Sequence, residues 1–302
     1  MKVFVTGASG FVGGAFVPEL LKAGHKVVAL ARSDSAAQKI KKMGSEIEIV
    51  KGTIEDLDVL EKAAAASDGV VHLGFIHDFN QYEKCCLIDR KATIAMLEAL
   101  KGSNKPYVQT AVCLVFPPDV LGTETGKKHT MGAASLRSET EDIVMSYKDK
   151  GVRTSSVRLP PSVHGKGDQG FVTGLIKIAN ATGKSGYIGS GANVWPAVSR
   201  FDAGRLLKLA LEKGQAGSAY HATADEGVKT KDIAETIGQL AGLPVESIEP
   251  AKAGEQFGSM SFFFSMGGPV SSKITREQLG WEPKELGLLD DIRENYVFEK
   301  ST

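Results

Sequence analysis

A glycine-rich turn near the amino terminus is the first stretch of the sequence whose residue types and spacing could do chemistry. It reads Thr-Gly-Ala-Ser-Gly-Phe-Val-Gly over residues 6–13 and follows a short apolar run. In such a turn Gly7 allows a sharp exit from a strand, Gly10 lets a pyrophosphate approach the backbone, and Gly13 lets a helix pack closely. The N–H groups at the start of that helix favour bound phosphate. The alternative is a purely structural turn. We expect a dinucleotide to be bound here by Gly7, Ser9, Gly10, Phe11, Val12 and Gly13.

The end of the next apolar run indicates which dinucleotide is bound. An NAD site places an acidic residue there, about 20 residues past the glycines, to bind the ribose hydroxyls. This chain has Arg32 followed by Ser33 at that point, and a guanidinium beside a hydroxyl suits the 2′-phosphate of NADPH. Asp34 is the argument for NADH, because a carboxylate would repel that phosphate. We interpret the pattern as an NADPH site.

Short apolar runs alternate with helix-length segments through the first half of the chain. Strands rich in valine and isoleucine that alternate with helices predict right-handed crossovers and a parallel sheet. The fold class expected is therefore α/β, a Rossmann doubly wound parallel sheet. The expected strands are Lys2–Thr6, Lys26–Leu30, Glu46–Val50, Gly69–Leu73, Tyr107–Thr110 and Thr154–Arg158. The expected helices are Phe11–Ala23, Ser35–Met43, Asp56–Ala66, Tyr82–Leu100 and Ala134–Lys150.

The pattern changes near Leu159, where glycine and proline become dense. A helix at Ala203–Lys213 and a strand at Ser218–Ala222 are expected to return to the first sheet. The tail is again helical at Lys231–Ala241 and Ser272–Gly280. We therefore predict an NADP-binding Rossmann domain at 1–160 plus about 198–224. A smaller, interleaved C-terminal substrate-binding domain is predicted at about 161–197 and 225–302.

The overall composition argues against several classes of protein. The 302 residues carry 36 Lys+Arg and 36 Asp+Glu, whereas nucleic-acid-binding domains usually carry a basic surface. No apolar run approaches the ~18 residues of a membrane span. The three cysteines cannot build a disulfide framework, which suits a reducing compartment, and the adjacent Cys85 and Cys86 are interpreted as packing residues. We expect a cytoplasmic monomer or homodimer whose partner is a small molecule, with no nucleic acid, membrane or metal site.

Five further segments join the glycine turn in a pattern that extends over nearly the whole chain. They are Asp68–Gly74, Arg158–Gly165, Tyr187–Gly191, Val198–Ala203 and Leu279–Pro283. Together the segments resemble the short-chain dehydrogenase/reductase superfamily, in its extended or atypical branch of epimerase/dehydratase-like proteins. The resemblance implies an active site in the cleft between a nicotinamide-binding sheet and a small C-terminal domain, with residues 187–195 walling the substrate pocket. It adds to the expected cofactor contacts Leu73, Gly74, Pro160 and Ser162.

The chain departs from this family at the catalytic residues. The family usually carries Tyr-x-x-x-Lys on the helix after the fifth strand, with a Ser or Thr at the tip of that strand. Counting back from Glu141 puts the lysine slot at Arg137 and the tyrosine slot at Ala133. At the strand tip only Thr110 or Cys113 could supply a polar group. The usual triad is therefore absent.

Arg137 can still act as a cation near the nicotinamide ribose. It cannot shuttle a proton, because a guanidinium stays protonated in proteins. The alternative for Arg137 is an exposed helical ion pair with Glu141, one turn further along. Tyr147 lies ten residues beyond Arg137, and we expect it to be irrelevant to catalysis.

Another side chain or water must then supply the proton in a reduction. The candidates are His164, because histidine titrates near neutral pH, Tyr187 at the expected pocket wall, and His77 after the fourth strand. For each, the alternative is a solvent-facing or packing side chain. The run Phe262–Phe264 is either a lid over an apolar pocket or a buried loop.

These residues favour an NADPH-dependent oxidoreductase that reduces the carbonyl of small aldehydes, ketones or electrophilic xenobiotics, lactone-type toxins among them. Hydride transfer itself needs only the cofactor and a placed carbonyl. One alternative is a nucleotide-sugar epimerase or dehydratase with tightly bound NAD, and another is a non-catalytic NADPH-binding sensor. We expect the catalytic residues to be among Thr110, Arg137, His164 and Tyr187.

Overall fold

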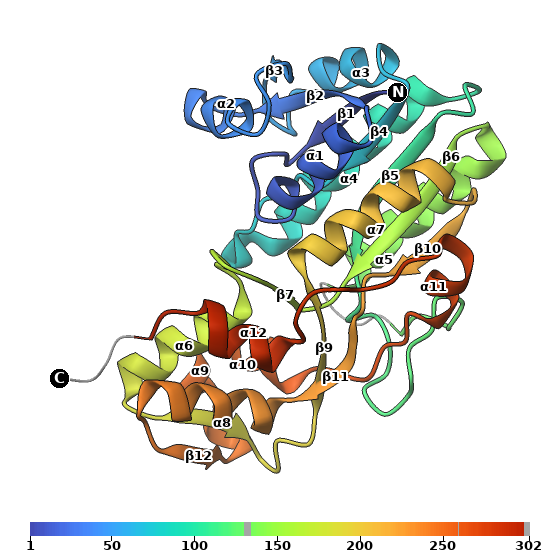
Figure 1. Ribbon diagram of the computed structural model, residues 1–302. Helices are drawn as coiled ribbons and strands as arrows, with labels where there is room; N and C mark the ends of the chain where they lie inside the picture. Colours follow the sequence, from blue (N-terminus) through green and yellow to red (C-terminus); the bar gives the residue numbers. More distant parts are fainter. Residues whose placement is uncertain (130–133, 259, 299–302) are drawn as a thin grey trace.

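Seven parallel strands form the central sheet, whose order is β10-β6-β5-β4-β1-β2-β3 (Figure 1). The computed structural model describes residues 1–129, 134–258 and 260–298. Every neighbouring pair of strands in this sheet is parallel. The prediction of a Rossmann-like doubly wound sheet is confirmed, including the return of the chain to this sheet as β10. The strands are β1 (Lys2–Thr6), β2 (Lys26–Ala31), β3 (Glu48–Lys51), β4 (Gly69–His72), β5 (Pro106–Val112), β6 (Arg153–Leu159) and β10 (Ser218–His221).

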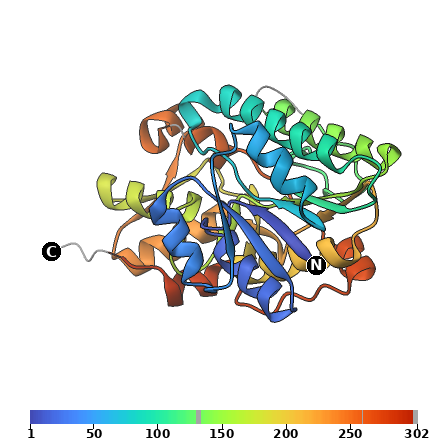
Figure 2. The same cartoon turned by 90° about the horizontal axis from the view of Figure 1, so that it is seen from above.

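Helices cover both faces of the sheet, because alternate side chains of each strand enter different cores. Val3 and Val5 join the core beneath α1, α2 and α7, whereas Phe4 joins the core beneath α3, α4 and α5. Seen from above, α4 and α5 lie on one side of the strands, and α1 and α7 lie on the other (Figure 2). The helices are α1 (Gly13–Lys22), α2 (Asp34–Lys41), α3 (Leu57–Ala65), α4 (Tyr82–Leu100), α5 (Ala134–Ser146) and α7 (Arg200–Lys213).

The second half of the chain adds two small sheets and a third hydrophobic core. One sheet has the order β11-β9-β7, and the other pairs β12 with β8. The strands are β7 (Ser162–His164), β8 (Ser185–Ile188), β9 (Val194–Ser199), β11 (Asp225–Lys229) and β12 (Val245–Ile248). The helices are α6 (Phe171–Thr182), α8 (Thr230–Ala241), α9 (Ala253–Phe257), α10 (Met260–Ser265), α11 (Lys273–Leu279) and α12 (Leu288–Asn295). Short 3-10 turns lie at Phe79–Gln81, Tyr147–Lys150 and Pro250–Lys252.

All of the helices and strands expected in the first half are present, with ends that shift by a few residues. The expected helix Ala134–Lys150 is α5 followed by a 3-10 turn. No helix among the described residues is long and apolar enough to cross a membrane. Nor do three or more His, Cys, Asp or Glu side chains come together to hold a metal ion in the part of the chain that the structure describes.

Candidate active site

The glycine turn between β1 and α1 has the backbone geometry of a phosphate-binding loop. Gly7 has a φ of +70°, and a Cβ atom there would lie 2.7 Å from the carbonyl carbon of Leu73. A Cβ atom on Gly13 would lie 2.2 Å from the oxygen of Gly7, so neither position accepts a side chain. The N–H of Gly10 donates to that same oxygen at 3.0 Å and closes the turn. Gly10 is exposed, with half-buried residues next to it, namely Ser9, Phe11 and Val12. These residues fit a pyrophosphate at the start of α1.

Thr6 ties this turn to the end of β4. Its Oγ1 accepts a hydrogen bond from the N–H of Gly74 at 3.0 Å and lies 2.6 Å from Nδ1 of His72. The contact holds Leu73 and Gly74, both half-buried, beside the glycine turn. The carboxyl ends of β1 and β4 therefore form one edge, which is where open α/β sheets bind ligands.

The segment that follows β6 leaves one hydroxyl unsatisfied. Pro160 and Ser162 are buried, and Oγ of Ser162 has no hydrogen-bond partner among the described residues. A buried hydroxyl without a partner is costly, so a bound group that pairs with it would stabilise the site. The geometry fits the expected cofactor contact at Ser162, which stays a prediction.

The carboxyl ends of β2 and β3 together carry two cations and one carboxylate. Arg32 and Ser33 are exposed, and Oγ of Ser33 caps α2 by accepting from the N–H of Ala36 at 3.2 Å. Asp34 binds Nζ of Lys51, at the end of β3, at 2.9 Å. The hydrogen bond between them and the positive charge of Lys51 lower the pKa of Asp34, and the same bond and the negative charge of Asp34 raise the pKa of Lys51. The carboxylate that could oppose a 2′-phosphate is thus already paired with a cation.

Thr110 and Arg137 come together at the tip of β5, as the sequence predicts. Nη2 of Arg137 donates to the carbonyl of Thr110 at 2.8 Å. Nη1 of Arg137 donates to Oδ2 of Asp89, on α4, at 2.7 Å. The alternative of an exposed ion pair between Arg137 and Glu141 is wrong, because Arg137 is buried and pairs with Asp89. Sequence spacing could not reveal this partner, which lies on another helix.

A chain of buried hydrogen bonds connects Arg137 to the glycine turn. Oδ1 of Asp89 lies 3.2 Å from Nε2 of His72, whose Nδ1 lies 2.6 Å from the hydroxyl of Thr6. Burial acts to raise the pKa of Asp89, but Arg137 and His72 outweigh it and hold that pKa below its ordinary value. Asp89 is therefore ionised at neutral pH and fixes the guanidinium of Arg137.

Aromatic side chains surround the other side of Arg137. Its Cζ lies 4.5 Å from the ring centroid of Phe75, in the loop after β4. The ring of His77 lies 5.2 Å from that of Phe75, and the ring of Tyr82 lies 6.1 Å from it. His77 is thus placed near Arg137, whereas Tyr82 was missed by the sequence analysis. The signal that could have found it is its position at the start of α4, next to the loop that follows β4.

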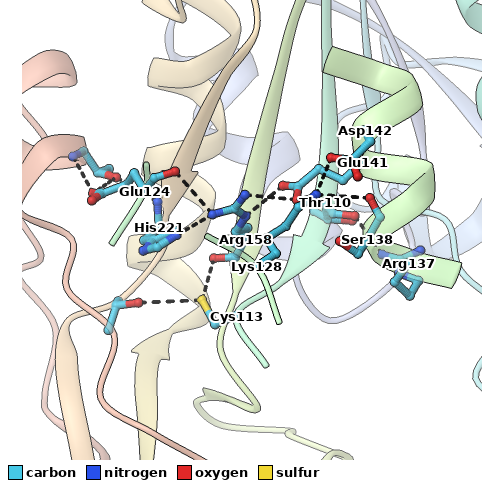
Figure 3. Close-up of polar contacts among 12 residues, drawn as sticks. Thr110, Cys113, Glu124, Lys128, Arg137, Ser138, Glu141, Asp142, Arg158 and His221 are labelled. Atoms are coloured by element: carbon cyan, nitrogen blue, oxygen red, sulfur yellow. Dashed lines mark hydrogen bonds and ion pairs between the residues drawn. The ribbon is translucent and has the colours of Figure 1, made fainter. Parts of the chain in front are cut away.

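A second arginine, Arg158 on β6, lies in another buried network, which meets α5 at Glu141, one helical turn from Arg137 (Figure 3). Its Nε and Nη2 donate to the two carboxylate oxygens of Glu141 at 2.8 and 3.1 Å. Its Nη1 donates to Nε2 of His221 at 3.1 Å, and Nδ1 of His221 donates to the carbonyl of Ser271 at 2.8 Å. Burial and then Arg158 lower the pKa of His221 to about 4, so the imidazole is neutral. Lys128 also contacts Glu141, at 3.2 Å.

Cys113 closes this network from the side of β5. Its Sγ donates to the carbonyl of Arg158 at 3.3 Å, and burial raises its pKa to about 12. Oε1 of Glu124 accepts two hydrogen bonds from Thr275, each of 2.7 Å. Most of these buried groups contact one another, so the network joins distant segments of the chain.

Comparison with known proteins agrees with this geometry. The family model described as the NAD dependent epimerase/dehydratase family matches residues 3–223, which is more than half of the chain. The chain belongs to this family. Its members are NAD(P)-dependent oxidoreductases and epimerases, so this chain is an epimerase/dehydratase-family oxidoreductase.

The relatives at high identity carry no assigned activity. An uncharacterised protein of Saccharomyces cerevisiae is 52% identical over 98% of this chain and 99% of its own length. Another, of Schizosaccharomyces pombe, is 44% identical over 99% of this chain and all of its own length. A 4-hydroxy-2-methyl-3-oxo-4-farnesyl-3,4-dihydroquinoline-1-oxide ketoreductase of Stigmatella aurantiaca is 23% identical over 82% of this chain and 75% of its own. Among solved structures, dTDP-glucose 4,6-dehydratase of Streptomyces venezuelae superposes with a TM-score of 0.80 at 18% identity, covering 98% of this chain and 95% of its own.

Next to the tip of β5, this member of the epimerase/dehydratase family has a small cavity. Its volume is about 140 Å³, and it is lined by residues of two segments: Cys113, Leu114, Phe116, Pro118, Ser265, Met266, Gly267, Gly268 and Val270. A dry cavity of about 150 Å³ binds benzene, so the space suits one small apolar group.

The run Phe262–Phe264 lies in α10, where Phe264 is buried and Phe262 is exposed, so it fits neither a simple lid nor a wholly buried loop.

Two of the expected proton donors do not lie where the sequence placed them. His164 does not face a cleft, since it is fully buried and its Nδ1 donates to Asp291 on α12 at 2.8 Å. Tyr187 lies on β8, which pairs with β12 in the second half of the chain, away from β5 (Figure 1). Nζ of Lys231 lies 5.7 Å from the centroid of its ring. No described contact joins His164 or Tyr187 to Thr110 or Arg137. Both expectations rested on the family's usual placement of these segments.

Tyr147 points away from Arg137, as expected from the spacing. Its hydroxyl donates to Oε1 of Glu98, on α4, at 2.6 Å. Ala133, the position of the family tyrosine, lies outside the described residues. Arg137, the residue in the predicted lysine slot, is held between Asp89 on α4 and Thr110 on β5.

Proposed function

We propose that this protein is an NADPH-dependent reductase of small aldehydes, ketones and electrophilic xenobiotic carbonyls, lactone-type toxins among them. The observation that carries the proposal is the charge arrangement at the ends of β2 and β3. Arg32 is exposed there, and Lys51 neutralises Asp34 at 2.9 Å. Because a guanidinium binds phosphate oxygens in a fixed fork geometry, this edge favours the extra 2′-phosphate of NADPH over the bare hydroxyl of NADH.

The substrate class is inferred from the cavity and from one relative. The cavity beside Cys113 has space for about 140 Å³ and is mostly apolar, so it favours a small hydrophobic substituent over a sugar nucleotide. The ketoreductase of Stigmatella aurantiaca, although distant, has a name that describes reduction of a ketone.

The described residues have distinct tasks in such a reaction. The glycine turn holds the pyrophosphate and Arg32 holds the 2′-phosphate. Arg137 holds the end of β5 against α4. NADPH, when bound, supplies the hydride. Positioning of the cofactor and substrate in this way lowers the activation free energy by several kcal/mol by itself. The only partner that the proposal requires is a small carbonyl compound.

The proposal is tested by cofactor titration followed by a screen of carbonyl compounds. Binding of NADPH and NADH is measured by fluorescence for the wild type, Arg32→Asp and the control Lys39→Asp, an exposed lysine on α2. Arg32→Asp should lose ~1.5–3 kcal/mol of NADPH affinity, roughly 10- to 150-fold, because a charge-assisted contact disappears. Its NADH affinity and both affinities of the control should change little. A wild type that binds the two cofactors within about twofold would contradict the assignment.

The screen measures NADPH oxidation with benzaldehyde, hexanal, cyclohexanone and phenylglyoxal. Turnover of at least one of these is expected. Release of tightly bound NAD from the denatured protein would instead favour the epimerase or dehydratase alternative. NADPH binding without oxidation by any of the four compounds would favour the sensor.

A further inference from the structure

Tyr82 and Arg137 contact the same aromatic ring, although they are far apart in the sequence. Cζ of Arg137 lies 4.5 Å from the centroid of Phe75, and the ring of Tyr82 lies 6.1 Å from that centroid. Phe75 follows Gly74, whose N–H is bonded to Thr6 beside the glycine turn. The three side chains therefore lie at the carboxyl ends of β4 and β5, the edge at which this fold binds dinucleotides.

We infer that Tyr82, supplied by α4, is the proton donor that replaces the family tyrosine missing from α5. The inference rests on the proposed carbonyl reduction. As hydride from NADPH forms the new C–H bond and the C=O π bond opens onto oxygen, the Tyr82 hydroxyl gives its proton to that oxygen. The products are an alcohol, NADP⁺ and a tyrosinate, and the tyrosinate then takes a proton from water.

The charges around Tyr82 suit this role. A tyrosinate that forms near the guanidinium of Arg137 is stabilised by attraction, which is what the family lysine provides to its tyrosine. Burial, then the charge of Cys86 and a hydrogen bond to its side chain, raise the pKa of Tyr82 to about 12, and Arg137 acts in the opposite direction. The phenol therefore carries its proton throughout the neutral range, which is the form a donor needs.

His77 also contacts the ring of Phe75, but it is less suited to donate a proton. Burial and the charge of Arg137 lower its pKa, so the imidazole is neutral at pH 7 and has no readily lost proton.

Access also distinguishes Tyr82 from the other tyrosines near α4 and α5. Tyr82 and Phe75 are half-buried, so a substrate can reach them from solvent. Tyr107 is fully buried, and Tyr147 is buried and bonded to Glu98. Tyr147 therefore provides a matched control on the same pair of helices.

The first test compares Tyr82→Phe with Tyr147→Phe in NADPH oxidation by the best substrate of the screen. Tyr82→Phe should lower kcat by ~10²–10⁴-fold, the usual contribution of a positioned acid. Its NADPH dissociation constant and thermal midpoint should stay near those of the wild type, because only one hydroxyl is removed. Tyr147→Phe and His77→Gln should retain most of the turnover. Full turnover by Tyr82→Phe would overturn the inference, and so would a loss found only in His77→Gln.

The second test needs no turnover. The protein is labelled with 3-fluorotyrosine, and the resonances of Tyr82 and Tyr147 are assigned by the two phenylalanine variants. Added NADP⁺ should shift the ¹⁹F resonance of Tyr82, because a donor must lie beside the nicotinamide, and should leave that of Tyr147 in place. An unchanged Tyr82 resonance at saturating NADP⁺ would place the ring away from the cofactor and reject the inference.

The two tests separate failure of this inference from failure of the proposed function. A wild type that reduces none of the carbonyl compounds contradicts the proposed function, while the ¹⁹F shift still decides whether Tyr82 lies at the cofactor. If the wild type reduces a carbonyl compound and Tyr82→Phe does so at the same rate, the proposed function stands and Tyr82 is not the proton donor.

Discussion

Two arginines near α5, Arg137 and Arg158, have similar partners but different surroundings. Each is buried and donates to a carboxylate, Arg137 to Asp89 and Arg158 to Glu141. Arg158 makes its remaining polar contacts with His221 and a carbonyl group inside the protein, so all three of its guanidinium nitrogens donate to protein groups, and its Cζ lies 5.5 Å from the ring of Phe116. Arg137 donates from two nitrogens and lies closer to an aromatic ring, 4.5 Å from that of the half-buried Phe75.

This difference separates a structural charge pair from a functional one. Arg158, whose three guanidinium nitrogens all donate to protein groups, holds segments together, and its loss should appear in stability. Arg137 donates from two nitrogens and contacts Phe75, which follows Gly74 beside the glycine turn, so it can also act on a bound molecule. The experiments below test this distinction, from the largest expected effect to the smallest.

Removal of Arg158 should give the largest loss of stability. Arg158→Ala leaves Glu141 buried without its main partner, and breaking a buried pair in this way typically costs about 3–5 kcal/mol. Denaturant unfolding measures the loss, and Lys39→Ala on the surface serves as the control. Adding Glu141→Gln to Arg158→Ala should recover part of the loss, since the unpaired charge is then gone. A loss below about 1 kcal/mol would remove the structural role assigned to Arg158.

The same network should make stability depend on pH through His221. Its pKa is about 4 in the folded protein, against about 6.5 for an unperturbed histidine. Because the unfolded chain binds the proton more tightly, His221 stabilises the fold fully above pH ~6.5, and this contribution is lost as the pH falls towards ~4. The loss amounts to roughly 3 kcal/mol.

Free energies of unfolding measured at several pH values check this dependence. His221→Gln should flatten the slope between pH ~6.5 and ~4, the interval between the two pKa values. The carboxylates of Asp89 and Glu141, whose pKa values lie below the ordinary range, add their own acid sensitivity at lower pH. An unchanged slope in the variant would show that burial and Arg158 do not hold the pKa of His221 below its ordinary value in the folded protein.

The smallest effect is expected at Tyr147. Tyr147→Phe removes one hydrogen bond to the partly exposed Glu98, which is worth about 0.5–1.5 kcal/mol at most. Carbonyl reduction should continue at the wild-type rate, as initial-rate kinetics would show. A large loss of turnover would mean that catalysis uses Tyr147 rather than the side of α5 that carries Arg137.

The fold could be predicted from sequence where local pattern and long-range structure agree. The glycine turn predicts β1 and α1, and the alternation of apolar runs with helical segments predicts the parallel sheet, because each of these patterns is contained within a short stretch of sequence. The helix α6 was missed because it is preceded and followed by glycines, Gly170 and Gly183, in a stretch where glycine and proline dominate.

The candidate site was predictable only in part, for a related reason. The residues themselves, Thr110 and Arg137, follow from their slots in the family pattern. The partner of Arg137 does not, because Asp89 lies 48 residues earlier on another helix. Glu141, one turn from Arg137, offered a local ion pair that the fold does not use. Tyr82, which contacts the same Phe75 ring as Arg137, could not be found for the same reason, because α4 and α5 are distant in the sequence and meet only in the folded protein.

The burial of every cysteine has a consequence for a protein that takes in reactive carbonyl compounds. Cys85, Cys86 and Cys113 are free and buried. Burial raises the pKa of Cys113 to about 12 and that of Cys86 above its ordinary value. Since the thiolate is the form that attacks electrophiles, these side chains are poor targets for the compounds that the protein is proposed to reduce. Cys113 lines the cavity proposed for the substrate, and its high pKa lowers its reactivity towards an electrophile bound there.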